Sequence, residues 1–335
     1  MCQIIHTFAA SMMTVMKQYV KIRCIFLLLG FLSIMVSCHS GGSDGRRVLS
    51  PEEERLARSG TIDSLTLRTV LNPDSIEGWE RLSSLTAETW MLMDDSTGMV
   101  ISQRYANEPT FMASLTKMMT CLLALENGNP SDTVQITDDV FIVKDSRVRL
   151  GDGYLLGNLI YEMMLQSDND AAYALAKHIA GDTLKFCDMM NEKAAYIGMN
   201  STHFSNPNGM PSLDNYSSAC DLIKLARYCM RDSIFAAIVG TVDKDIPLTD
   251  GRHMPCHNTN TLLSTYEGCI GIKTGFTRQA GNCLVSAATR DGVTLYLVLL
   301  NSRSMSSRFT ESAILLDYGF RVMEAYKHTL LYEAS

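Results

Sequence analysis

The stretch Ala113-Ser114-Leu115-Thr116-Lys117 places a hydroxyl and an amine three residues apart, directly before a strong helix-forming run at 118–126. Because residues i and i+3 share one face of a helix, the Lys117 amine can reach the Ser114 hydroxyl. A helix N-terminus also offers free backbone N–H groups and the positive end of the helix dipole, which would stabilise an oxyanion beside Ser114. In isolation, Ser-x-x-Lys is more often a helix cap followed by a solvated lysine. The motif alone therefore does not indicate a catalytic site, and further motifs are needed.

Two more short motifs follow in the chain. Ser167-Asp168-Asn169 lies on the connection between two helices that the apolar spacing predicts at 155–165 and 171–180. Lys273-Thr274-Gly275 lies within 270–277, a run that predicts a strand. Loops between helices carry function more often than helix bodies do, so the second motif is also a candidate for chemistry.

The three motifs together supply the parts that acyl transfer requires, namely a nucleophile, a proton shuttle and an oxyanion site. A serine attacks once a base takes its proton, and a lysine acts as that base only when burial or a neighbouring cation lowers its pKa. We therefore expect Ser114 to be the acyl-ester nucleophile and Lys117 the general base. Ser167 is expected to relay the proton to the leaving amine.

Other positions of the same motifs are predicted to bind the substrate. Asn169 would hold a backbone amide of the substrate, and Lys273 adds a second cation that would help to keep the first lysine neutral. Gly275 has no side chain, so an extended substrate can lie along this strand edge as an added strand. The backbone N–H groups of Ser114 and Phe276 are candidates for the oxyanion site. The expected substrate-binding residues of these motifs are Asn169, Lys273, Thr274, Gly275 and Phe276.

Apolar patterns elsewhere predict strands towards both ends of the chain and helices in the middle. Short apolar runs flank a turn at 95–98, which indicates a β-hairpin, and two strands are predicted at 283–288 and 294–300. Further helices are predicted at 183–197, 217–231 and 306–326. Strands that enclose a helical middle predict an α+β sheet domain with a helical insertion.

The N-terminal segment has the pattern of a secretory signal. Three basic residues precede an apolar run at 25–36, which is too short for a membrane span. Met35-Val36-Ser37-Cys38 resembles the lipobox of a bacterial lipoprotein, with Met in place of the usual Leu. This resemblance implies cleavage before Cys38 and lipidation of its thiol, and the alternative is an uncleaved anchor or ordinary secretion. We expect a signal peptide at 1–37, a tether and polar lead-in at 38–88, and a catalytic domain at 89–327.

Charge limits the partners of the mature chain. Residues 1–37 contain three basic and no acidic residues, so their removal changes the balance from 29 basic against 36 acidic residues to 26 against 36, or −10. An acidic chain without a basic cluster argues against a nucleic-acid partner. It also gives no support to electrostatic membrane binding, so attachment to a membrane would depend on the lipid.

The ordered set of three motifs is typical of penicillin-binding proteins and class A β-lactamases. Over roughly residues 90–322, the sequence resembles the low-molecular-weight penicillin-binding proteins, which are serine D-Ala-D-Ala carboxypeptidases. The resemblance implies a transpeptidase/β-lactamase-like fold, in which an antiparallel sheet flanked by helices joins a helical subdomain, with the site between them. The matching stretches are Ala113-Ser114-Leu115-Thr116-Lys117-Met118-Met119-Thr120, Ser167-x-Asn169-Asp170-Ala171-Ala172, Asn206-Pro207-x-Gly209, Gly271-Ile272-Lys273-Thr274-Gly275-x-Thr277, and Ala280-Gly281 with Leu284-Val285.

The same resemblance implies an activity in the cell envelope or periplasm. The protein would remove the terminal D-Ala from peptidoglycan stem peptides through an acyl-serine intermediate, and β-lactams would acylate Ser114 as substrate mimics. No cofactor or metal is expected. In the family, an arginine near the last helix helps to recognise the substrate carboxylate; Arg308 stands at the matching place, and the alternative for it is a solvated surface arginine. Many relatives carry a further β-rich domain and a C-terminal anchor, so a lipid on Cys38 would take over anchoring here.

Three other functions are alternatives. A class A β-lactamase fits Asp168, which stands where the carboxypeptidases commonly have Gly. However, only Glu192 and Glu267 lie between the second and third motifs to serve as its deacylating base, and the sequence after Glu192 does not match that family. A metallopeptidase would need converging ligands, but no His-Glu-x-x-His is present, and His253 and His257 are interpreted as loop or surface residues. A non-enzymatic lipid-anchored binding protein would have no need of the intact nucleophile.

Overall fold

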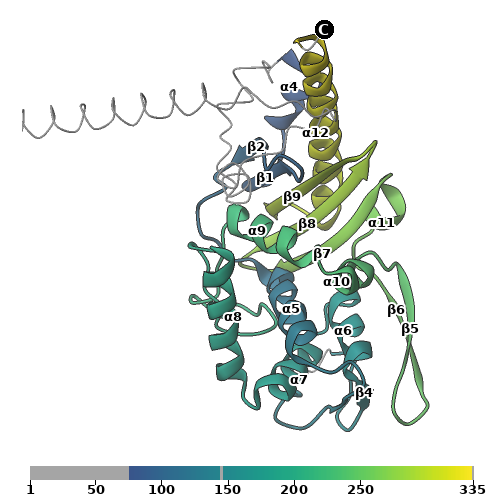
Figure 1. Ribbon diagram of the computed structural model, residues 1–335. Helices are drawn as coiled ribbons and strands as arrows, with labels where there is room; N and C mark the ends of the chain where they lie inside the picture. The colour runs from purple at the N-terminus through teal and green to yellow at the C-terminus, as the bar shows by residue number, and fades with distance from the viewer. Residues whose placement is uncertain (1–74, 144–145, 334–335) are drawn as a thin grey trace, which may run out of the picture. The chain divides into compact units, whose positions relative to one another are not determined.

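The computed structural model describes residues 75–143 and 146–333 (Figure 1). The predicted signal peptide, the predicted lipidation site Cys38 and most of the predicted tether lie outside the described residues. A search of the described helices found none with the length and apolarity that crossing a membrane requires.

A five-stranded antiparallel sheet has the strand order β2-β1-β9-β8-β7. Strands from the two ends of the described chain meet where β1 pairs with β9, with Thr89 opposite Leu300 and Asp94 opposite Leu295. This order leaves β7, which carries the third motif, as an outer strand of the sheet (Figure 1). The predicted hairpin and strands are confirmed, with bounds β1 (Thr89–Asp94), β2 (Val100–Arg104), β7 (Cys269–Thr277), β8 (Gly281–Arg290) and β9 (Val293–Ser302).

Both faces of the sheet are covered, because alternate residues of a strand point to opposite faces. On β1, Trp90 and Leu92 pack in a cluster with the long helix α12 (Met305–Glu333). Met91 and Met93 belong to the larger core that the other helices share. All six residues of β1 are buried as a result, which explains why residues 90–93 are a continuous apolar run rather than an alternating one.

The helical middle of the chain is present as predicted, and the α+β fold class is confirmed. Helices α7, α8 and α9 each follow an N-cap whose side chain accepts a backbone hydrogen bond, from Asp168, Asp182 and Ser218 respectively. Helices α7 and α8 end at Gly181 and Gly198, which have positive φ. The helices are α5 (Lys117–Asn127), α6 (Leu156–Leu165), α7 (Asn169–Ala180), α8 (Thr183–Ile197), α9 (Ala219–Cys229) and α10 (Ser233–Val239).

The hairpin of β5 (Asp243–Pro247) and β6 (His253–His257) was not predicted from the sequence. Each strand has one buried residue, Ile246 or Cys256, so no apolar alternation marks the pair. His253 and His257 are surface residues, but they lie on β6 and not in a loop. Shorter elements are α4 (Trp79–Leu82), η2 (Ala113–Thr116), β3 (Thr133–Gln135), β4 (Gly153–Leu155) and α11 (Leu262–Thr265).

Candidate active site

Ser114 and Lys117 lie at the junction of two helical segments. Ser114 is in η2, a single 3₁₀ turn, and Lys117 is the first residue of α5. Lys117 Nζ lies 3.0 Å from Ser114 Oγ, which is hydrogen-bond distance. The structure therefore brings the two groups together as the sequence predicts, although the 3₁₀ turn, and not the α-helix itself, carries the serine.

The amine of Lys117 is fully buried and has polar contacts besides Ser114. Its Nζ donates to Asn169 Oδ1 at 2.8 Å and to the carbonyl oxygen of Asn208 at 2.6 Å. Burial lowers the pKa of Lys117 from 10.5 to about 7, and the charge of Asp168 partly opposes this effect. An amine with this pKa can accept a proton near neutral pH, and activation of a serine requires such a base.

Lys273, the cation of the third motif, is also buried. Burial is the main reason that the pKa of Lys273 is well below 10.5, and the charges of Lys117 and Arg308 lower it further. Burial is the largest cause of the lowered pKa of Lys117, and the expected role of Lys273 in keeping Lys117 neutral stays a prediction.

The second motif forms the start of α7 and faces the first through Asn169. Ser167 has φ +63°, which is uncommon for a residue other than glycine, and Asp168 is the N-cap of α7. The Asp168 carboxylate accepts hydrogen bonds from Ser146 Oγ and from the backbone N–H groups of Arg147, Val148 and Ala171. Asp168 thus fastens the 146–148 segment to the motif. In the described part of the chain no hydrogen bond joins the Ser167 hydroxyl to Lys117, so its relay role stays a prediction.

The third motif lies against the serine along the outer strand β7. A Cβ atom added at Gly275 would lie 3.1 Å from the Met112 carbonyl oxygen and 3.3 Å from the Ser114 backbone nitrogen. Glycine thus allows a close approach of the strand to Ser114, because a side chain here would make contacts tighter than usual. Thr274 Oγ1 is 2.7 Å from Thr259 Oγ1, and the Phe276 side chain is 60% exposed. The site is therefore bordered by an unpaired strand edge beside Ser114.

Arg308 on α12 reaches the same strand. It is 5% exposed, and its Nη1 donates to the carbonyl oxygen of Gly275 at 3.2 Å. The alternative interpretation of Arg308 as a solvated surface arginine is wrong. Its Nε is buried without a hydrogen-bond partner among the described residues, so the guanidinium retains one unused donor.

The loop at 206–210 is a part of the site whose role the sequence did not reveal. The carbonyl of Asn208 accepts from Lys117 Nζ, and the carbonyl of Pro207 accepts from Thr120 Oγ1 at 2.6 Å. A backbone carbonyl carries no signal in the sequence. The turn-forming residues Asn206-Pro207-Asn208-Gly209 were the signal that could have identified this support for Lys117.

Replacement of Gly209 with Ala is expected to damage both stability and activity. Gly209 has φ +85°, and a Cβ there would lie 2.0 Å from the Ala113 carbonyl oxygen and 2.9 Å from the Ser114 nitrogen. Since these are backbone atoms, the clash has to displace the 3₁₀ turn or the loop. We expect a loss of roughly 2–4 kcal/mol in the free energy of unfolding, measured by urea denaturation.

Gly251→Ala is the matched control, because φ there is +84° but the added Cβ contacts nothing within 4 Å. If Gly209→Ala and Gly251→Ala lost the same free energy of unfolding, the clash with the backbone at residues 113–114 would not be the cause.

Comparison with known proteins agrees with this geometry. A family model described as D-alanyl-D-alanine carboxypeptidase matches residues 77–304. A D-alanyl-D-alanine carboxypeptidase of a Streptomyces species is 35% identical over 247 residues, which cover 68% of this chain and 85% of the relative. A carboxypeptidase of Bacillus subtilis is 29% identical over 72% of this chain, and the match spans 64% of that longer protein.

The solved structures give the same result. The crystal structure of a Streptomyces DD-transpeptidase is similar with a TM-score of 0.67 and 32% sequence identity, over 70% of this chain and 97% of that one. These matches do not favour a β-lactamase or a non-enzymatic binding protein. The chain therefore belongs to the D-alanyl-D-alanine carboxypeptidase family, a family of serine peptidases that act on peptidoglycan.

Proposed function

We propose that Ser114 cleaves the terminal D-Ala from peptidoglycan stem peptides through an acyl-enzyme. The Ser114 oxygen forms a bond to the penultimate D-Ala carbonyl carbon, and the amide C–N bond breaks. The leaving D-Ala takes up a proton as its free amine, and water then hydrolyses the ester. The observation that carries the proposal is the buried Lys117 amine, with a pKa lowered to about 7, at 3.0 Å from Ser114 Oγ.

The remaining motif residues have supporting roles in this proposal. Ser167 passes the proton from Lys117 to the leaving nitrogen, and Asn169 holds both the lysine amine and a substrate amide. The substrate lies along the free edge of β7 with its reacting carbonyl between the backbone N–H groups of Ser114 and Phe276. The close approach of Gly275 to the Ser114 nitrogen supports this placement.

Arg308 and Lys273 supply positive charge for the substrate carboxylate in the same proposal. Both side chains are almost completely buried, and the Nε of Arg308 has no partner among the described residues. A carboxylate that enters beside Gly275 would stabilise the protonated forms of both groups. This pairing would select a peptide with a free C-terminus.

The cellular part of the proposal concerns export and attachment. The protein acts in the cell envelope, held to a membrane by a lipid on Cys38, and contributes to cell-wall metabolism and cell shape. The lipobox-like Met35-Val36-Ser37-Cys38 supports this assignment. Mass spectrometry of the protein from membranes tests it, because a chain that begins at Cys38 with added acyl mass is expected. A chain that begins elsewhere without lipid would contradict it.

The activity is tested by two incubations of the purified protein. One uses benzylpenicillin and intact-protein mass, and the other uses a tripeptide ending Lys-D-Ala-D-Ala with an assay for free D-Ala. A stable penicilloyl adduct together with D-Ala release supports the proposal. Rapid penicillin turnover without D-Ala release would instead identify a β-lactamase, and the absence of both reactions would identify a binding protein.

The rate of acylation is expected to rise with pH through about 7. Lys117 must be neutral to accept the serine proton, and burial lowers its pKa to about 7. Below this pH the lysine is protonated, so the second-order rate constant for penicillin acylation should fall about tenfold per pH unit. Stopped-flow measurement between pH 5 and 9 provides the check. A rate that stays constant from pH 5 to 7 would exclude Lys117 as the base.

A further inference from the structure

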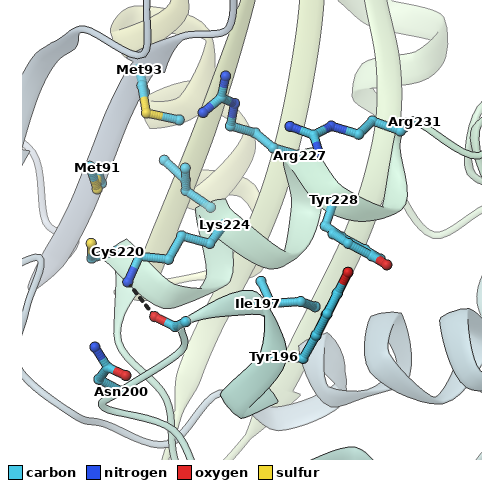
Figure 2. Close-up of a pocket in the computed structure, with 12 residues that line it drawn as sticks. Met91, Met93, Tyr196, Ile197, Asn200, Cys220, Lys224, Arg227, Tyr228 and Arg231 are labelled. Carbon is cyan, nitrogen blue, oxygen red and sulfur yellow. Dashed lines mark hydrogen bonds between the residues drawn. The ribbon is translucent and has the colours of Figure 1, made fainter. Parts of the chain in front are cut away.

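A cavity of about 470 Å³ lies between the end of α8, helix α9 and strand β1, away from the catalytic residues (Figure 2). Ser114 lies against β7, and the order of the sheet places β9 and β8 between β1 and β7. Three strand spacings correspond to roughly 14 Å. A group in this cavity is therefore distinct from the peptide that reacts at Ser114.

The walls of the cavity combine an apolar floor with a row of cations. Met91 and Met93 of β1 form part of the floor. Lys224, Arg227 and Arg231 lie at intervals of three and four residues, so they share one side of α9 and its C-terminal extension. The lining contains no Asp or Glu, although acidic residues outnumber basic ones by 36 to 29 in the whole chain.

The three cations differ in how far they are already neutralised. Lys224 donates to Asp221 Oδ1 at 2.9 Å, and Arg227 donates to Asp95 Oδ1 at 2.8 Å. Arg231 is exposed and has no ion pair or side-chain hydrogen bond within the described ranges. Its guanidinium therefore keeps its planar set of donors for a ligand, and this geometry matches a carboxylate.

Two tyrosines also line the cavity. Tyr196 at the end of α8 is 75% exposed, and its ring centroid lies 6.3 Å from that of Tyr228 on α9, with the rings nearly perpendicular. The ammonium of Lys193 lies 5.2 Å and 5.6 Å from the two ring centroids and holds the pair in place. Figure 2 shows the two phenol groups next to one another. Such rings offer an apolar face and a hydroxyl, which suit a sugar ring or a peptide plane.

We propose that this cavity is a second binding site for the sugar–peptide polymer on which the enzyme acts, an inference that rests on the proposed function. Arg231 binds the carboxylate of a stem peptide that is not being cleaved. Tyr196 and Tyr228 pack against the adjoining sugar or peptide backbone. Occupation of the cavity keeps the polymer close to the protein and raises the effective concentration of further stem peptides at Ser114.

The test compares a polymeric with a small substrate in the Arg231→Ala and Tyr196→Ala variants. With insoluble peptidoglycan, the KM for D-Ala release is expected to rise about 3- to 10-fold in each variant. With the tripeptide, which cannot reach both sites, kcat/KM should stay within about twofold of the original. Arg81→Ala is the matched control, because Arg81 is an exposed arginine on α4 outside the cavity.

A second measurement separates this proposal from the catalytic one. Co-sedimentation with peptidoglycan uses Ser114→Ala as the background, so it does not depend on turnover, and Arg231→Ala should weaken it. The second site would be overturned if Arg231→Ala lowered kcat/KM equally for the tripeptide and for peptidoglycan. It would also be overturned if Arg231→Ala left binding to peptidoglycan unchanged. Loss of binding to vesicles containing anionic lipid, with peptidoglycan binding intact, would assign the cavity to a membrane surface and would also overturn it.

Discussion

Ser114→Ala is expected to abolish the penicilloyl adduct and to lower D-Ala release by at least about 10³-fold. The variant removes the oxygen that forms the ester, while the remaining side chains keep their positions. Lys117 retains its hydrogen bonds to Asn169 and to the carbonyl of Asn208, so little change in stability is expected. Intact-protein mass after incubation with benzylpenicillin, together with the D-Ala assay, provides the measurement.

The control for this variant is Ser306→Ala, since Ser306 is an exposed serine at the start of α12. It should keep the adduct and the rate of D-Ala release within about twofold of the original. An adduct that persists in Ser114→Ala would move the nucleophile to another residue. The tryptic peptide that carries the added mass would then identify that residue.

The elements that build the site could be predicted because their signals are local. Helices α6, α7 and α8 have apolar spacing, and α7 and α8 also have capping side chains and terminal glycines. Strands β8 and β9 have apolar runs around the turn at 290–292. The contact between Ser114 and Lys117 could be predicted for the same reason, since the two residues are three positions apart in the sequence.

Features that depend on distant contacts could not be predicted in the same way. The support of Lys117 by the carbonyl of Asn208 joins residues 91 positions apart through a backbone atom, which any residue could supply. Burial is the largest cause of the lowered pKa of Lys117, and burial follows from packing that no single motif describes. The β5–β6 hairpin was missed because each of its strands has only one buried residue, so the apolar signal is weak.

Asp168, which stands where the carboxypeptidases commonly have glycine, has a structural and an electrostatic role. The sequence showed only that a carboxylate stands where glycine is common. In the structure it caps α7, holds the 146–148 segment through backbone N–H groups, and raises the pKa of Lys117 against the effect of burial. Asp168 thus affects both the backbone conformation around the second motif and the pKa of Lys117.

Lys117→Met is expected to lower penicillin acylation and D-Ala release by about 10³-fold or more without unfolding the protein. Methionine fills a similar volume but cannot accept the serine proton. Two buried acceptors, Asn169 Oδ1 and the Asn208 carbonyl, lose a donor, at a cost of roughly 1–3 kcal/mol each. Against this, a pKa shift from 10.5 to about 7 means that the buried lysine destabilises the fold by roughly 4–5 kcal/mol at pH 7. The two effects offset, so the Tm should stay within a few degrees.

The pH dependence of stability separates this explanation from a general structural defect. Because the folded-state pKa of Lys117 is the lower one, the unfolded state binds the extra proton between about pH 7 and 10.5. The lysine therefore destabilises the fold fully below pH 7, and the free energy of unfolding rises as the pH increases through this window. In Lys117→Met the rise should become smaller by the contribution of Lys117, whereas the contribution of Lys273, whose pKa is also lowered by burial, remains. Urea denaturation of both proteins at pH 7 and pH 9.5 can measure this difference. A variant that loses activity but keeps the whole rise would show that Lys117 is charged in the folded protein, and Lys117 could not then be the base that activates Ser114.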